Sequence, residues 1–133
     1  VDIDQWPNHR QASKWQRETC RNIVNASCDP DVCFNWIQKV RRTVALEELL
    51  EAPWQFRTLE PKIRKAAYNV CKGAFKKDMD DKMQAMEDAD PPRLMKGSQV
   101  FWFMIQEMTR TLPEQLSTSY QEICMLWTER KQK

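Results

Sequence analysis

The sequence predicts an all-α protein, a compact bundle of six to seven helices around a central hydrophobic helix at about residues 94–112. Glycine is scarce, with only Gly73 and Gly97, and the prolines stand mainly at the edges of apparent segments. Apolar residues recur at helical spacing, and no strand pattern competes with them. A chain of 133 residues is one domain by size and is large enough to bury a core. We therefore expect an arm over residues 1–12 and a single helical domain over 13–131.

The central helix is the most apolar segment of the chain. Its apolar residues recur every three or four positions: Val100, Met104, Ile105, Met108 and Leu112. The run Phe101, Trp102 and Phe103 extends this stripe around most of the helix. A helix that is apolar nearly all round has neighbours on several sides. It is too short, and too closely flanked by charge, to span a bilayer.

Two helices are expected after the N-terminal arm, which Trp6 would dock. The first begins at a capping-box pattern, Ser13 followed by Gln16, and runs to about Ala26. Its inward residues are Trp15, Cys20, Ile23 and Val24. The second begins at Asp29-Pro30, an N-cap followed by proline in the first helical position, and runs to about Arg41. Its inward face is Cys33, Trp36, Ile37 and Val40.

A short third helix is expected between residues 43 and 53. Thr43 would cap it, and Pro53 would stop it. Its apolar residues are Leu46, Leu49 and Leu50. Trp54 and Phe56 follow in a connector, and we expect both rings to fill the core from there.

The segment after the connector is expected to form two helices, with a central and a last helix beyond them. Thr58 would cap the first, whose inner stripe is Ile63, Ala67, Val70 and Ala74. This stripe loses its phase near Asp78, so we predict a break there, with Asp78 capping a Met-rich helix to about Asp88. Asp90-Pro91-Pro92 links it to the central helix. A last helix over residues 117–130 is indicated by Tyr120, Ile123, Cys124 and Trp127.

The sequence lacks the common motifs of catalytic, metal-binding and phosphate-binding sites. His9 is the single histidine and lies in the polar arm, which argues against a hydrolase triad or a histidine base. Five cysteines, without a Cys-x-x-Cys pair, are read as reduced and mostly buried thiols of an intracellular, cytoplasmic protein. Two glycines cannot supply a phosphate-binding loop of a common kind. We therefore expect no enzyme activity, no catalytic residues, no cofactor and no metal site. We also expect a piece of a longer product, because the chain does not start with Met and shows no signal-peptide pattern.

Charge is distributed unevenly, although the formal net charge is only +2. Residues 62–77 contain six bases and no acids, and residues 78–90 contain six acids and one base. Such a pair of segments can join copies of one protein through complementary patches, or contact RNA phosphates, or simply face solvent. The candidate assembly or RNA-contact face comprises Lys62, Lys65, Lys72, Lys76, Lys77, Met79, Met83 and Met86.

A series of phrases spans about residues 15–127. In order they are the helix from Trp15 to Ala26-Ser27, then Asp29-Pro30, Phe34-Asn35-Trp36-Ile37, Leu46-Glu47-Glu48-Leu49, Phe56-Arg57-Thr58-Leu59-Glu60-Pro61-Lys62, Ala66-Ala67 through Lys72-Gly73, Leu94-Met95-Lys96-Gly97-Ser98-Gln99-Val100-Phe101-Trp102 and Tyr120. In this order they resemble the Gag (capsid) polyprotein of copia-type LTR retrotransposons, especially the dinoflagellate-type lineage. A domesticated derivative of such an element would look the same.

The resemblance implies a non-enzymatic structural protein, because Gag capsid regions are helical, self-associate into a particle and enclose the RNA of the element. This chain would cover mainly the N-terminal part of such a region, and it lacks the family's zinc knuckle. The expected partners are therefore other copies of the chain, with RNA as a further partner and no membrane insertion. The alternative from another class is a helical accessory subunit or adaptor that binds heterologous subunits of a larger intracellular complex through exposed Trp and Met.

Overall fold

The computed structural model describes residues 1–46, 49 and 52–110, and the regular structure in this part of the chain is helical. It contains five α-helices and the 3-10 turn η2: α1 (Ala12–Asn25), α2 (Pro30–Arg42), η2 (Trp54–Phe56), α3 (Leu59–Val70), α4 (Gly73–Glu87) and a helix over residues 97–110. The all-α class is confirmed. The predicted number of six to seven helices is too high for the described residues, and the predicted last helix lies outside them.

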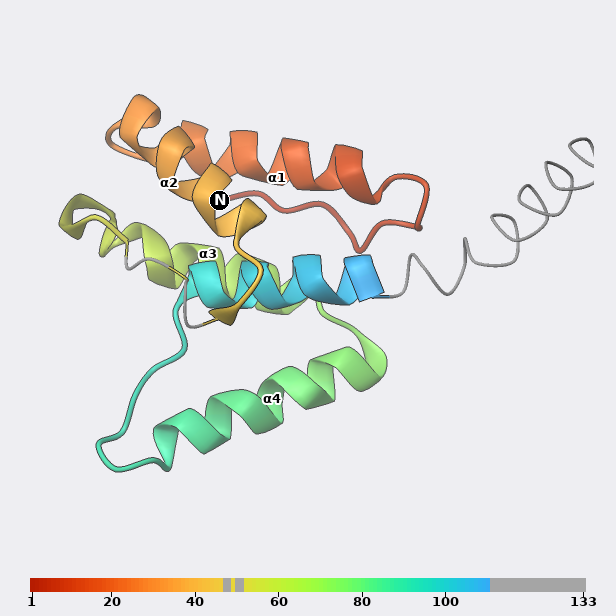
Figure 1. Cartoon of the computed structure of the whole chain (residues 1–133), viewed down its shortest axis with the longest axis vertical. Helices are drawn as coiled ribbons and strands as arrows, with labels where there is room; N and C mark the ends of the chain where they lie inside the picture. The colour runs from red at the N-terminus through yellow and green to blue at the C-terminus, as the bar shows by residue number, and fades with distance from the viewer. Residues whose placement is uncertain (47–48, 50–51, 111–133) are drawn as a thin grey trace, which may run out of the picture.

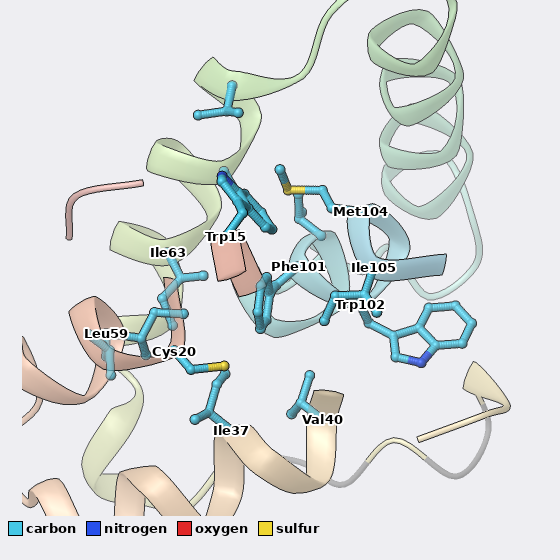
Figure 2. Packing of buried hydrophobic residues seen from close by; sticks show 14 of the residues in the cluster. Trp15, Cys20, Ile37, Val40, Leu59, Ile63, Phe101, Trp102, Met104 and Ile105 are labelled. Carbon is cyan, nitrogen blue, oxygen red and sulfur yellow. The ribbon is translucent and has the colours of Figure 1, made fainter. Parts of the chain in front are cut away.

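The helix over residues 97–110 occupies the middle of the described part (Figure 1), with α1 and α2 on one side and α4 on the other. Trp15 of α1 packs against Phe101, with ring centroids 6.1 Å apart. On the other side, the Lys82 ammonium of α4 lies 5.6 Å from the centre of the Phe103 ring. Phe101 and Met104 are fully buried, and Figure 2 shows them among core side chains from several elements. The predicted central helix is present, but it begins at residue 97 and not at 94.

The α1–α2 pair follows the predicted pattern closely. Asp29 accepts a hydrogen bond from the backbone N–H of Val32 and caps α2, with Pro30 in the first helical position. All four predicted inward residues of α2 are buried, as are three of the four in α1, Val24 being half-buried. The predicted capping box is wrong, because the N-cap of α1 is Gln11, two residues before Ser13, and no side chain caps the helix.

The N-terminal arm is fixed to the helical body by its backbone and by Trp6. The Trp15 indole N–H donates to the Asp4 carbonyl (3.0 Å), and the Asn22 side chain donates to the Asp2 carbonyl (2.9 Å). The Trp6 ring packs against Phe75 of α4, with centroids 5.2 Å apart. The arm therefore connects α1 to α4, which are far apart in sequence.

The predicted cap of a short helix at Thr43 is wrong, and so is one of the two predicted core rings; part of the predicted helix itself, residues 47–48 and 50–51, lies outside the described residues. The Thr43 hydroxyl donates to the Lys39 carbonyl (2.6 Å) and ends α2, and the Trp102 indole donates to the Thr43 carbonyl (2.9 Å). The hydroxyl that would cap a following helix is thus bonded back to α2, so Thr43 ends a helix instead of starting one. Phe56 is fully buried and stacks on Trp36 at 5.6 Å, whereas Trp54 is 78% exposed. Leu50 lies outside the described residues.

The break between α3 and α4 comes at Cys71–Lys72 and not at Asp78. Gly73 has a φ of +60°, a conformation that favours glycine, and this turn ends the phase of α3. Ala74, which would continue the α3 stripe, is therefore exposed. Asp78 lies inside α4 and pairs with Lys82 (2.9 Å) in place of capping a helix.

Contacts at the start of the 97–110 helix, several of them with α3, determine where this helix begins. The carboxylate of Glu60, in the first turn of α3, accepts hydrogen bonds from the backbone N–H and the hydroxyl of Ser98, both at 3.0 Å. The Gln99 side chain accepts a hydrogen bond from the Lys96 N–H (2.8 Å), as in one half of a capping box. Gly97 has no side chain, so α3 approaches closely: a Cβ would lie 2.6 Å from the backbone N of Arg64. These contacts join the starts of the two helices.

Candidate assembly surface

The five lysines of the predicted face lie along α3, the turn after it and the first part of α4. Lys62, Lys65, Lys72 and Lys77 are exposed. Lys76 is half-buried, because its ammonium lies 4.7 Å from the centre of the Tyr68 ring of α3. Four of the five lysines are therefore available to a partner, and the fifth holds α4 against α3.

The acidic residues follow along the rest of α4. Asp78 pairs with Lys82, and Asp80 accepts a hydrogen bond from the Tyr68 hydroxyl (2.6 Å), which raises the pKa of that tyrosine. The remaining acids of α4 and its C-cap, Asp81, Glu87 and Asp88, are exposed. One helix therefore carries a basic start and an acidic end.

This order of charges opposes the dipole of α4. The start of a helix favours acids and its end favours bases, each by about 0.3–1 kcal/mol at exposed positions. In α4 the first turn contains no acid and the last turn no base, while Lys72 is the N-cap and Asp88 the C-cap. The arrangement therefore weakens the isolated helix, so local helix stability does not explain it.

The methionines of the predicted face are placed differently from the lysines. Met79 is fully buried and belongs to the core, so it offers no surface to a partner and is removed from the candidate face. Met83 and Met86 are half-buried and pack against the core. The phase predicted for the three methionines is right, and it explains their burial, because this stripe attaches α4 to the body.

A second surface feature, which we call the α3 cleft, opens between η2, the start of α3 and the segment before residue 97. Its volume is about 530 Å³. Trp54 and Leu94 line it and are 78% and 58% exposed. Arg57 and Arg64 add positive charge to the lining, and neither forms an ion pair with a carboxylate of the described residues. The cleft thus combines exposed apolar surface with two guanidinium groups.

Glu60 also lines this cleft but has a structural task. Its side chain is buried, with both oxygens bonded to Ser98. Burial raises the pKa of Glu60, and the hydrogen bonds from Ser98 lower it by less. Both carboxylate oxygens of Glu60 thus bind Ser98 and join α3 to the 97–110 helix.

The described thiols are not arranged for chemistry. Cys20, Cys33 and Cys71 are buried and unpaired, and Cys28 is exposed. Burial raises the pKa of Cys20 and of Cys71 to about 11, so both stay protonated and unreactive at neutral pH. Over residues 1–46, 49 and 52–110, no group of three or more His, Cys, Asp or Glu side chains could hold a metal ion. None of the helices in that part of the chain is both long and apolar enough to cross a membrane.

Comparison of the chain with protein-family models, with curated proteins and with solved structures finds no match. The surface therefore has to be interpreted from its own geometry. The α3 cleft is not predicted from the sequence, because the expected place of Trp54 is the core. The signal that could have found it is Pro53, which starts a new turn and thereby separates the directions of Trp54 and Phe56.

Proposed function

We propose that this chain is a non-enzymatic structural domain that self-assembles, in the manner of a retrotransposon Gag capsid, through the charged surfaces of α3 and α4. The observation that carries the proposal is the order of charges on α4, which costs helix stability and leaves a basic and an acidic surface side by side. Complementary patches of this kind steer copies of one protein into a defined orientation. The resemblance to Gag in the order of sequence phrases adds to this support.

RNA is the second partner in this proposal. Exposed lysines on α3 and in the following turn can contact phosphates without reading bases. No aromatic ring lies exposed among these lysines, since Tyr68 is half-buried and covered by Lys76. RNA would therefore be held by charge, and its binding would fall steeply with salt.

The alternative is a helical adaptor or accessory subunit of a larger complex, localised inside the cell. The exposed Trp54 and Leu94 in the α3 cleft favour this possibility, because a partner protein could cover them. An adaptor would remain monomeric when alone. The two proposals therefore differ in the mass of the isolated chain.

Charge reversal tests the assembly proposal. Lys72 and Lys77 are both exposed, so Lys72→Glu with Lys77→Glu should weaken self-association while the fold persists. Lys76 is left unchanged because it packs on Tyr68. The matched control is Arg17→Glu with Arg21→Glu, which reverses two exposed bases on α1. Light scattering gives the molar mass, and circular dichroism checks the fold.

A compensating pair makes the test sharper. Adding Asp81→Lys and Asp88→Lys to the lysine variant exchanges the two signs, since both acids are exposed. We expect this exchange to restore association, because the basic and acidic surfaces would again be complementary. Assembly that is unchanged in the lysine variant, or equally weakened by the α1 control, would refute the role of this surface.

A further inference from the structure

Two large aromatic side chains stand out on the described surface. Trp54 is 78% exposed and Phe34 is 51% exposed, while the other described aromatic rings are buried or half-buried. Exposed aromatic rings beside charge are typical of contact sites between proteins. Trp54 belongs to the α3 cleft, and Phe34 lies on α2.

Phe34 shares its side of α2 with an acid. Asp31 stands three residues earlier, and residues three apart on a helix are neighbours on its surface. Asp31 is exposed and forms no ion pair with any base in the described part of the chain. We call Asp31 and Phe34 the α2 patch.

The α2 patch cannot enter the cleft of its own chain. Trp36 faces inward and stacks on Phe56 of η2, the element that borders the cleft. Phe34 is two residues away, which is about 200° around the helix, so it points away from η2. An occupant of the cleft with this chemistry must come from a second molecule.

The cleft repeats the spacing of the patch with the opposite charge. Trp54 and Arg57 are three residues apart across η2, and residues with this separation lie on one side of a 3-10 turn. Arg57 is exposed, and Arg64 adds a second guanidinium to the cleft. The α2 patch therefore offers an acid and then an aromatic ring, and the cleft offers an aromatic ring and then an arginine, with the same spacing of three residues. The two pairs are complementary in charge when they meet in antiparallel order.

We propose that the α2 patch of one copy binds in the α3 cleft of a second copy. Phe34 packs between Trp54 and Leu94, and Asp31 meets Arg57 and Arg64. A cleft of about 530 Å³ has room for an aromatic side chain. The contact joins two different surfaces, so in a pair the first copy keeps its cleft free and the second keeps its patch free, and association continues into a ring or a filament. This inference rests on the proposed self-assembly, but it uses a different surface from the charged faces of α3 and α4.

Mixing two variants tests this contact. The patch variant carries Asp31→Asn and Phe34→Ala, and the cleft variant carries Trp54→Ala and Arg57→Gln, so that the altered patch and the altered cleft do not attract each other. We expect each variant alone to associate only at a protein concentration about tenfold or more above that of the wild type. Mixed together in the Lys72→Glu, Lys77→Glu background, which weakens association through α3 and α4, they should form a one-to-one heterodimer and no longer species, because only one intact patch and one intact cleft remain. All four side chains are exposed, and Val44→Ala, at an 81% exposed apolar residue, is the control.

A charge exchange within one chain guards against a variant that simply folds badly. Asp31→Arg alone and Arg57→Glu alone should each weaken association, and the two together should restore it. Wild-type assembly that persists in the patch and cleft variants would overturn this inference and leave the proposed function standing. A wild-type chain that stays monomeric would overturn both. Binding of a single-stranded RNA oligonucleotide, lost with Trp54→Ala while association is unchanged, would assign the cleft to RNA and overturn the proposal.

Discussion

Replacing Gly97 with alanine should destabilise the protein, even though alanine is the better helix former. A Cβ at this position would lie 2.6 Å from the backbone N of Arg64 and 2.7 Å from the Cβ of Ile63. The first is a backbone atom of α3 and the second is bonded directly to that backbone, so neither can move aside as the end of a flexible side chain can. The substitution must therefore push the 97–110 helix away from α3 and stretch the bonds between Ser98 and Glu60.

The size of the effect follows from two opposing contributions. Overpacking a well-packed contact costs about 1–3 kcal/mol, and the upper end applies here because backbone atoms are involved. Alanine gains at most about 1 kcal/mol of helix propensity over glycine. The net loss should be about 2 kcal/mol, a large share of the about 5–15 kcal/mol by which domains are stable.

Urea unfolding followed by circular dichroism measures this loss as a lower midpoint at an unchanged slope. The control is Gly73→Ala, where no atom lies within 4 Å of a Cβ and only the φ of +60° is strained. That variant should lose about 1 kcal/mol. A Gly97→Ala protein as stable as the wild type would refute the close approach of the two helices.

Two further predictions concern titratable groups. Because burial raises the pKa of Glu60, the folded state holds this proton more tightly, so its contribution to stability is present at acidic pH and is lost as the pH rises through the folded pKa. In urea unfolding series, the free energy of unfolding of the wild type minus that of Glu60→Gln should therefore fall as the pH rises above about 4.3. A difference that increases with pH would contradict this. In thiol labelling near pH 8, exposed Cys28 should react at once, while Cys20 and Cys71 should react only on unfolding, since burial raises each pKa to about 11; rapid labelling of either would contradict their burial.

The sequence predicts the helices well where apolar period and capping residues agree. Asp29-Pro30 marks the start of α2, and the stripe of Cys33, Trp36, Ile37 and Val40 is buried as expected. The central helix is also found where its apolar residues place it. In these segments the apolar residues at helical spacing are the same residues that are buried in the core.

The errors arise where contacts distant in sequence decide. Thr43 resembles an N-cap, but its hydroxyl donates back to Lys39 and its carbonyl accepts from the indole of Trp102, so it ends α2. The helix continuing from Val70 looks uninterrupted until Gly73 adopts a positive φ. The burial of Glu60 depends on Ser98, which lies 38 residues away, and no local pattern carries that information.

The candidate surface is predicted only in part. The alternation of basic and acidic segments is visible in the sequence, and four of its lysines are exposed. The core position of Met79 and the conflict of charge with the α4 dipole follow from where α4 begins, and its N-cap is Lys72, six residues before the predicted Asp78. The α3 cleft needs the three-dimensional meeting of η2, α3 and Leu94.

The molar mass of the wild-type chain, measured by light scattering over a range of protein and salt concentrations with and without RNA, tests the central claim most directly. We expect growth from the monomer into large species as protein concentration rises, with dissociation at high salt, because the joined surfaces are charged. A constant monomer mass under all these conditions would contradict self-assembly.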